Sequence, residues 1–143
     1  MRVSKLFIVI SLSLSLILGL NAQHTVEKTL VKSFNLQGND LIDLNLGGDV
    51  QVKEWKSPAI RVQMLIILEN GNESMLKSLI KAGRYNLTST QTEDSFEINI
   101  PGLDREVMIK GAPLVDNVSF IVYIPSGTNI REAIIAAAEL DEE

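Results

Sequence analysis

Few residues in this sequence could carry out chemistry. Among its 143 residues there is one His and no Cys. Without Cys the chain has no thiol nucleophile, no thiolate zinc site and no disulfide. The single His24 lies near the start of the expected mature chain, without the fixed partners that a His-based catalytic or metal site needs. No glycine-rich phosphate-binding motif is present. We therefore predict no catalytic, cofactor-binding or metal-binding residue.

Acidic side chains are the remaining candidates, because paired carboxylates serve glycoside hydrolysis. They alternate with apolar residues along predicted strands, as the solvated face of a sheet requires. Two G-x-D units, at 38–40 and 47–49, have the nine-residue spacing of calcium-binding β-roll repeats, but no third copy follows. We expect a protein that is not an enzyme and holds no cofactor; the carboxylates set aside are Asp40, Asp43, Asp49, Glu54, Glu97, Asp104 and Glu106.

The first 22 residues have the pattern of a secretory signal peptide. Arg2 and Lys5 precede an apolar stretch over 6–20, and Ala22 supplies the small residue before a cleavage site. An uncleaved membrane anchor is the alternative interpretation, although serines within the stretch lower its hydropathy. We expect cleavage after Ala22, no stable membrane span afterwards, and a periplasmic or cell-surface location if the source is a bacterium.

Composition sets the class of the mature chain. Hydrophobic residues make up 45% and charged residues 22%, and the net charge is −5. Such a chain can build one globular core. Removal of the basic signal segment would make the charge more negative, so nucleic acid is not an expected partner.

Apolar and polar residues alternate with period two through most of residues 23–130, which predicts half-buried strands. The expected fold is mainly β: an antiparallel sheet or sandwich, or a short solenoid-like domain. For one turn, the alternation of apolar and polar residues predicts the length of the loop. A three-residue loop over 47–49 pairs Leu46 with Val50 and Leu44 with Val52, which favours a hairpin. Alternatively, the two runs flank a solenoid corner.

Two helical segments are expected. The strand over 60–68 becomes apolar on both faces at its end, which predicts a covering element. The segment 72–82 can supply it, because Asn72 or Ser74 can cap a helix with an apolar stripe and Gly83 can end it. Residues 131–143 form an Ala-rich acidic tail of good helix formers.

Trp55 is the aromatic residue with the best placement for contact with a partner. It lies at a predicted strand end among charged residues, where an exposed ring could anchor a partner or a buried ring could close the sheet. Trp55 is the one partner-contact residue that the sequence predicts.

A family resemblance follows from the segments 46–52 (LGGDVQV), Trp55, 60–62 and 122–127 (VYIPSG). Over residues 30–130 the chain resembles the N-terminal part of a family of exported bacterial adhesins, the auto-transporter adhesin head-domain type. That resemblance implies an adhesin-like surface module whose stacked β-solenoid is missing here after residue 127. It implies no catalytic residues.

We therefore expect a non-enzymatic interaction module of the cell envelope or surface, which contacts an envelope protein or itself through a strand edge. The alternative is a small periplasmic protein that binds an apolar ligand in a pocket between helix and sheet. Such a pocket would be lined by Met75, Leu79, Ile66 and Phe120.

Overall fold

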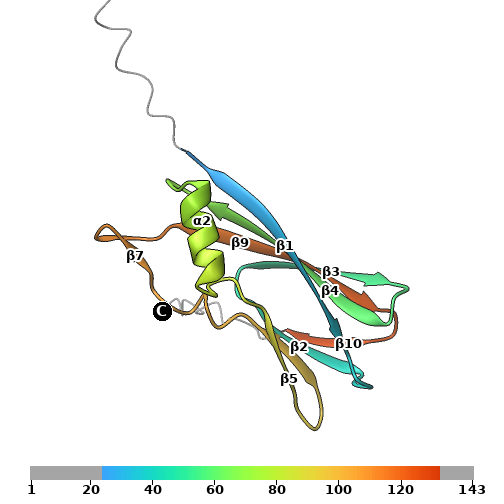
Figure 1. Cartoon of the computed structure of the whole chain (residues 1–143). Helices are drawn as coiled ribbons and strands as arrows, with labels where there is room; N and C mark the ends of the chain where they lie inside the picture. The colour runs from blue at the N-terminus through green and yellow to red at the C-terminus, as the bar shows by residue number, and fades with distance from the viewer. Residues whose placement is uncertain (1–23, 133–143) are drawn as a thin grey trace, which may run out of the picture.

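The computed structural model describes residues 24–132, which form two four-stranded β-sheets packed face to face, with one short helix at an end (Figure 1). The fold is mainly β, as the sequence predicts. Each sheet mixes parallel and antiparallel neighbours rather than being antiparallel throughout.

The first sheet has the strand order β1–β4–β9–β3. Its second strand pairs antiparallel with the first and third, and the edge strand β3 runs parallel to β9. The strands are β1 (Val26–Asn35), β3 (Asp49–Trp55), β4 (Ala59–Leu68) and β9 (Asp116–Pro125).

The second sheet has the order β10–β2–β6–β5. Here β2 runs parallel to both of its neighbours, while β5 and β6 are antiparallel. A small two-stranded hairpin, β7 with β8, lies in the connection between β6 and β9. The strands are β2 (Leu41–Asn45), β5 (Thr88–Gln91), β6 (Phe96–Asn99), β7 (Met108–Ile109), β8 (Ala112–Pro113) and β10 (Asn129–Glu132).

The core lies between the sheets. Along β4 every even-numbered residue is buried and every odd-numbered one is half-buried, because successive side chains of a strand point to opposite faces. Leu65 and Ile67 remain half-buried on the outer face, so the expected burial of both faces at the end of β4 is wrong. The most deeply buried side chains come from both sheets: Ile42, Ile60, Val62, Met64, Ile66, Leu68, Ile98, Phe120 and Val122.

The helix α2 (Glu73–Lys81) lies where the sequence predicts it. Asn72 caps it, since its Oδ1 accepts a hydrogen bond from the Met75 backbone N–H over 2.9 Å. Leu76 and Leu79 are buried in the same core as the inner face of β4. The helix therefore covers the inner face of the first sheet, near the point where β1 begins and β4 ends (Figure 1).

The hairpin that parity favours at 47–49 is wrong. The chain passes from the second sheet to the first at Gly47 and Gly48, so β2 and β3 flank a corner between the two sheets of a sandwich, neither a hairpin nor the solenoid corner of the alternative interpretation. Both glycines have positive φ, +67° and +77°. A corner and a hairpin both need a glycine with positive φ at this position, so the alternation of apolar and polar residues does not distinguish them.

The boundary of the predicted helical tail is also wrong. Arg131 and Glu132 belong to β10, where pairing with β2 overrides their helix propensity. The rest of that tail, 133–143, and the predicted signal peptide, 1–22, lie outside the described residues. Within the described part of the chain, no helix has the length and hydropathy of a membrane-spanning segment.

Candidate functional site

The edge strands β3 and β10 lie on the same side of the sandwich. Each ends the strand order of its sheet. On the opposite side β1 faces β6 and β5: the rings of Phe34 and Phe96 lie 6.2 Å apart, and Lys32 Nζ donates to the Leu87 carbonyl oxygen over 2.6 Å. The other ends of the two sheet orders therefore lie together, and we call this surface the β3/β10 side.

Two short connections build the β3/β10 side, one from β2 to β3 and one from β9 to β10. The second connection is tied to β3, because the Ser126 backbone N–H donates to the Trp55 carbonyl oxygen over 3.2 Å. In the first, a Cβ at Gly48 would lie 2.5 Å from the carbonyl oxygen of Val118. Both a left-handed φ and a close backbone approach thus require glycine there.

Trp55, the predicted partner-contact residue, lies at the end of β3 and is half-buried. Its indole Nε1–H donates to the Ala59 carbonyl oxygen over 2.8 Å, and its ring lies 5.5 Å from that of Tyr123 at a tilt of 41°. These contacts fix the indole at the rim of the β3/β10 side while part of it stays exposed.

The outward-facing residues of β3 are polar. Asp49, Gln51 and Lys53 are exposed, whereas Val50 and Val52 are half-buried against the core. Neither Asp49 nor Lys53 takes part in an ion pair within residues 24–132. Glu54 is exposed as well, so the edge carries two exposed acidic side chains and one basic side chain.

On β10 the exposed charge is neutralised within the sheet. Arg131 binds both carboxylate oxygens of Asp43 on β2, over 2.7 and 2.6 Å, and Ser95 donates to the same carboxylate over 2.6 Å. The hydrogen bonds from Arg131 and then Ser95 lower the pKa of Asp43 below its ordinary value. This pair joins the last described strand to the middle of its sheet.

The most buried ionic group, formed by Arg84, Tyr85 and Asp116, was not predicted from the sequence. Arg84 binds Asp116 through Nε and a terminal nitrogen, over 2.7 and 2.9 Å, and the Tyr85 hydroxyl donates to Asp116 over 2.7 Å. The side chains of Arg84 and Asp116 are 10% and 7% exposed. Arg84 also donates to the carbonyl oxygens of Gly102 and Arg105, so the cluster holds the 100–107 connection against the start of β9.

Opposing effects act on the pKa values of this cluster. Burial alone would raise the pKa of Asp116, but the hydrogen bonds from Arg84 and Tyr85 outweigh it and keep that pKa below its ordinary 3.8. Burial, together with the hydrogen bond to Asp116, raises the pKa of the Tyr85 hydroxyl above its usual range. Asp116 thus stays ionised and Tyr85 neutral, which suits a structural ion pair.

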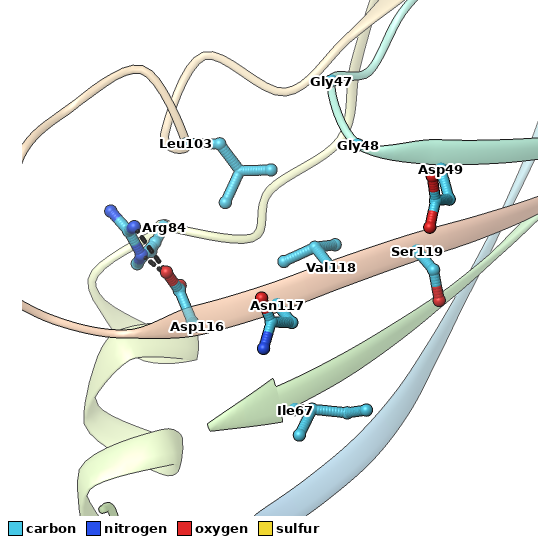
Figure 2. Close-up of a pocket in the computed structure, with 10 residues that line it drawn as sticks. All are labelled: Gly47, Gly48, Asp49, Ile67, Arg84, Leu103, Asp116, Asn117, Val118 and Ser119. Atoms are coloured by element: carbon cyan, nitrogen blue, oxygen red, sulfur yellow. Dashed lines mark hydrogen bonds and ion pairs between the residues drawn. The ribbon is translucent and has the colours of Figure 1, made fainter. Parts of the chain in front are cut away.

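An open groove of about 590 Å³ lies beside this cluster, and Figure 2 shows the side chains that line it. It runs from Arg84 and Asp116 along the start of β9 to the Gly47–Gly48 corner, with Leu103 above it. Arg84 and Asp116 neutralise each other in its wall, Asp49 lines it without an ion pair among the described residues, and the rest of the lining is apolar or small and polar. A second groove, of about 450 Å³, lies between α2 and the inner face of β1 and β4.

The remaining candidates from the sequence lie apart. His24 is exposed ahead of β1, and in the described range no three His, Asp or Glu side chains gather as a metal site would need. Of the four residues expected to line an apolar pocket, Leu79, Ile66 and Phe120 are buried in the core and Met75 is half-buried. Except for Asp43, the carboxylates set aside from chemistry are exposed or half-buried and form no ion pair among the described residues: Asp40, Asp49, Glu54, Glu97, Asp104 and Glu106.

The fold and the site together define a small mixed-sheet β-sandwich in which, among residues 24–132, the edges of β3 and β10 on one side and of β1 and β5 on the other have no further strand neighbour. Comparisons of the chain with protein-family models, curated proteins and solved structures found no match. The resemblance to the bacterial adhesins therefore stays a prediction.

Proposed function

We propose that this protein is an exported, non-enzymatic module that makes protein contacts at the cell envelope or cell surface, in the manner of an adhesin. In a bacterium it would act in the periplasm or at the surface, with an envelope protein or another copy of the chain as partner. The signal-like first 22 residues and the net charge of −5 support this location and argue against nucleic acid as a partner.

The observation that carries the proposal is the β3/β10 side. An unpaired edge strand presents a row of backbone donors and acceptors that a second strand can use. Here two such edges lie together, and Trp55 supplies a half-buried aromatic ring at the rim. Aromatic residues of this kind are frequent energetic centres of protein interfaces.

The test places a photo-reactive amino acid at Lys53 on β3, in the full chain expressed in its source cells. A matched control carries it at Thr29, which is exposed on the opposite edge strand of the same sheet. Cells are irradiated before lysis and fractionated, and the mass of the chain is measured. We expect a chain that begins at Gln23, in the periplasmic or surface fraction, cross-linked from position 53 and not from position 29.

The cross-linked partner is identified by mass spectrometry and tested again with Trp55→Ala, which should weaken the cross-link. An uncleaved chain held in the membrane without a cross-link would contradict the proposal. So would equal cross-linking from positions 29 and 53, because the contact would then not use the β3/β10 side.

The groove between α2 and the first sheet favours one second candidate, a binding protein for an apolar ligand. Its lining includes the apolar residues Leu30, Met64, Ile80 and Leu87 and the basic residues Lys32 and Lys81. A fluorescent fatty acid should then bind the purified protein, and Ile80→Asp should abolish the binding without unfolding it. Absence of saturable binding would remove this candidate.

A further inference from the structure

The backbone of β3 has hydrogen-bonding groups that no other strand of the described chain uses. Within residues 24–132 its one strand neighbour is β9. The carbonyl of Trp55 accepts from Ser126, which follows β9, so the odd-numbered residues of β3 direct their backbone groups toward β9. Successive strand residues alternate in this direction. The N–H and C=O groups of Val50, Val52 and Glu54 therefore point away from the sandwich.

Two of the three exposed charges of β3, Asp49 and Lys53, are self-complementary under a twofold rotation, and the third, Glu54, comes opposite Gly48 of the second copy. Asp49 and Lys53 lie two residues before and two residues after Gln51. When two β3 strands pair antiparallel with Gln51 opposite Gln51, Asp49 of each copy faces Lys53 of the other. Opposite charges directly across an antiparallel pair stabilise it, and like charges destabilise it.

The same register satisfies the backbone. It sets Val50 opposite Val52 of the second copy, and both residues direct their N–H and C=O groups outward. Such residues form the hydrogen-bonded pairs of an antiparallel ladder, while Gln51 and the two charge pairs occupy the non-hydrogen-bonded positions, where side chains lie closer. The Trp55 ring then comes opposite Gly47 of the second copy, which has no side chain to obstruct it.

Neighbouring registers lose this match. A shift of two residues in one direction sets Lys53 against Gln51, and a further shift sets Lys53 against Lys53. The opposite shift sets Asp49 against Gln51. A shift by one residue would set each valine opposite an odd-numbered residue, whose backbone groups point toward β9, so the ladder between the copies could not form. The charges therefore select one register among those that the edge allows.

We propose that the protein forms a twofold dimer by antiparallel pairing of β3 with β3 of a second copy, centred on Gln51. The pairing joins the first sheets of two copies into one continuous sheet. The proposed dimer rests on the proposed function in one respect, because both use the β3/β10 side. It names a second copy of the chain as the partner at that side.

The first test exchanges the charges in the full chain, purified after export, and measures the dimer dissociation constant by sedimentation. Lys53→Asp and Asp49→Lys each replace attraction with repulsion at two symmetry-related pairs and should weaken the dimer about tenfold or more. The double variant D49K/K53D restores opposite charges and should recover the affinity of the original chain. Both positions are exposed, so circular dichroism should show unchanged folding.

The second test uses the absence of Cys from the chain. In the proposed register the Cα atoms of Gln51 and its symmetry mate lie about 4.5 Å apart, within the range that a disulfide spans. Gln51→Cys should therefore form a covalent dimer under mild oxidation. Thr29→Cys, the control on the opposite edge strand, should stay monomeric at the same concentration.

A monomer at all concentrations would overturn the proposal, including the case in which residues 133–143, which follow β10, cover β3. A dimer insensitive to the charge exchange would overturn the register and thereby the proposal. Failure here remains distinguishable from failure of the proposed function. A monomer cross-linked to an envelope protein from position 53 refutes the dimer alone, whereas a dimer found outside the envelope refutes the envelope role alone.

Discussion

At the scale of single residues, the ion pair between Arg84 and Asp116 affects the stability of the fold more than any exposed charge does. Both side chains are nearly buried, and Tyr85 completes the set of hydrogen bonds. Removal of one member of a buried pair leaves the other charge without compensation, which costs more than the pair itself contributes. The exposed pair of Lys77 and Glu73 on α2, by contrast, contributes little.

We expect Asp116→Asn to lower the free energy of unfolding by about 2 to 3 kcal/mol, because the Arg84 guanidinium loses its counter-charge in a partly dry site. Urea denaturation followed by circular dichroism measures the change. Asp104→Asn, at an exposed position of the 100–107 connection, is the control and should change stability by less than about 0.5 kcal/mol. Equal effects of the two variants would show that the cluster is not structural.

The pH dependence of stability follows from the same residues. The folded-state pKa values of Asp116 and Asp43 are lowered, so each carboxylate contributes stability that is complete above its unfolded pKa. That contribution is lost as pH falls through the folded values. The urea midpoint should therefore be flat above about pH 5 and fall steeply below about pH 4. Asp116→Asn should make this acid loss shallower, and an unchanged slope would contradict the assignment.

The position of Asp116 in the sequence points to this cluster, although its residue type alone does not. Asp116 is in phase with Val118, Phe120 and Val122, the buried face of β9. A carboxylate at an inward position needs a partner, so parity indicates an ionic contact there. Parity does not reveal that the partner is Arg84, since these residues lie 32 positions apart and meet only in the folded chain.

At the scale of elements, the Gly47–Gly48 corner controls how the two sheets connect. Its two glycines share a positive φ but differ in surroundings: nothing lies within 4 Å of a Cβ at Gly47, whereas the Val118 carbonyl oxygen lies 2.5 Å from one at Gly48. The cost of an alanine therefore separates into a backbone contribution, common to both, and a steric contribution at Gly48 alone.

Gly47→Ala should lower the free energy of unfolding by about 1 to 2 kcal/mol, the cost of a left-handed L-residue. Gly48→Ala should lose about 1 to 3 kcal/mol more, because β9 must move away from the added methyl group. Chemical denaturation of the two variants side by side measures the difference. Equal losses would show that β9 does not approach the corner this closely.

The existence of the strands could be predicted from the sequence, and their partners could not. The runs within 60–68 and 118–124 each place an apolar residue at every second position, because one face of each strand is buried and the other is at most half-buried. The helix was predictable too, since Asn72 and Gly83 mark its ends locally. The pairing of strands could not be predicted, because the alternation of apolar and polar residues describes only segments that are close in sequence. β2 pairs with β6 and β10, which lie far along the chain. For Trp55, the sequence predicted a place at the end of a strand but not the neighbours that surround it in the fold.

At the scale of the whole molecule, both sheets share one core, so they should unfold together. Trp55 reports on the first sheet by fluorescence, and Phe96 anchors the second sheet against Phe34. We expect one transition in which Trp55 fluorescence and far-ultraviolet circular dichroism coincide. Phe96→Leu should shift both signals by the same amount. A Trp55 transition that Phe96→Leu leaves unmoved would show that the sheets unfold independently.

The parallel strands also bear on the time that the chain needs to fold. The bond between Arg131 and Asp43 joins residues 88 positions apart, and the pairing of β2 with β10 forms only when the last described strand arrives. Chains dominated by such distant contacts fold in milliseconds to seconds rather than microseconds. During synthesis, one edge of β2 stays unpaired until the residues of β10, 129–132, have been made. Such a delay prolongs the unfolded state of the chain, the state that the export proposed above requires.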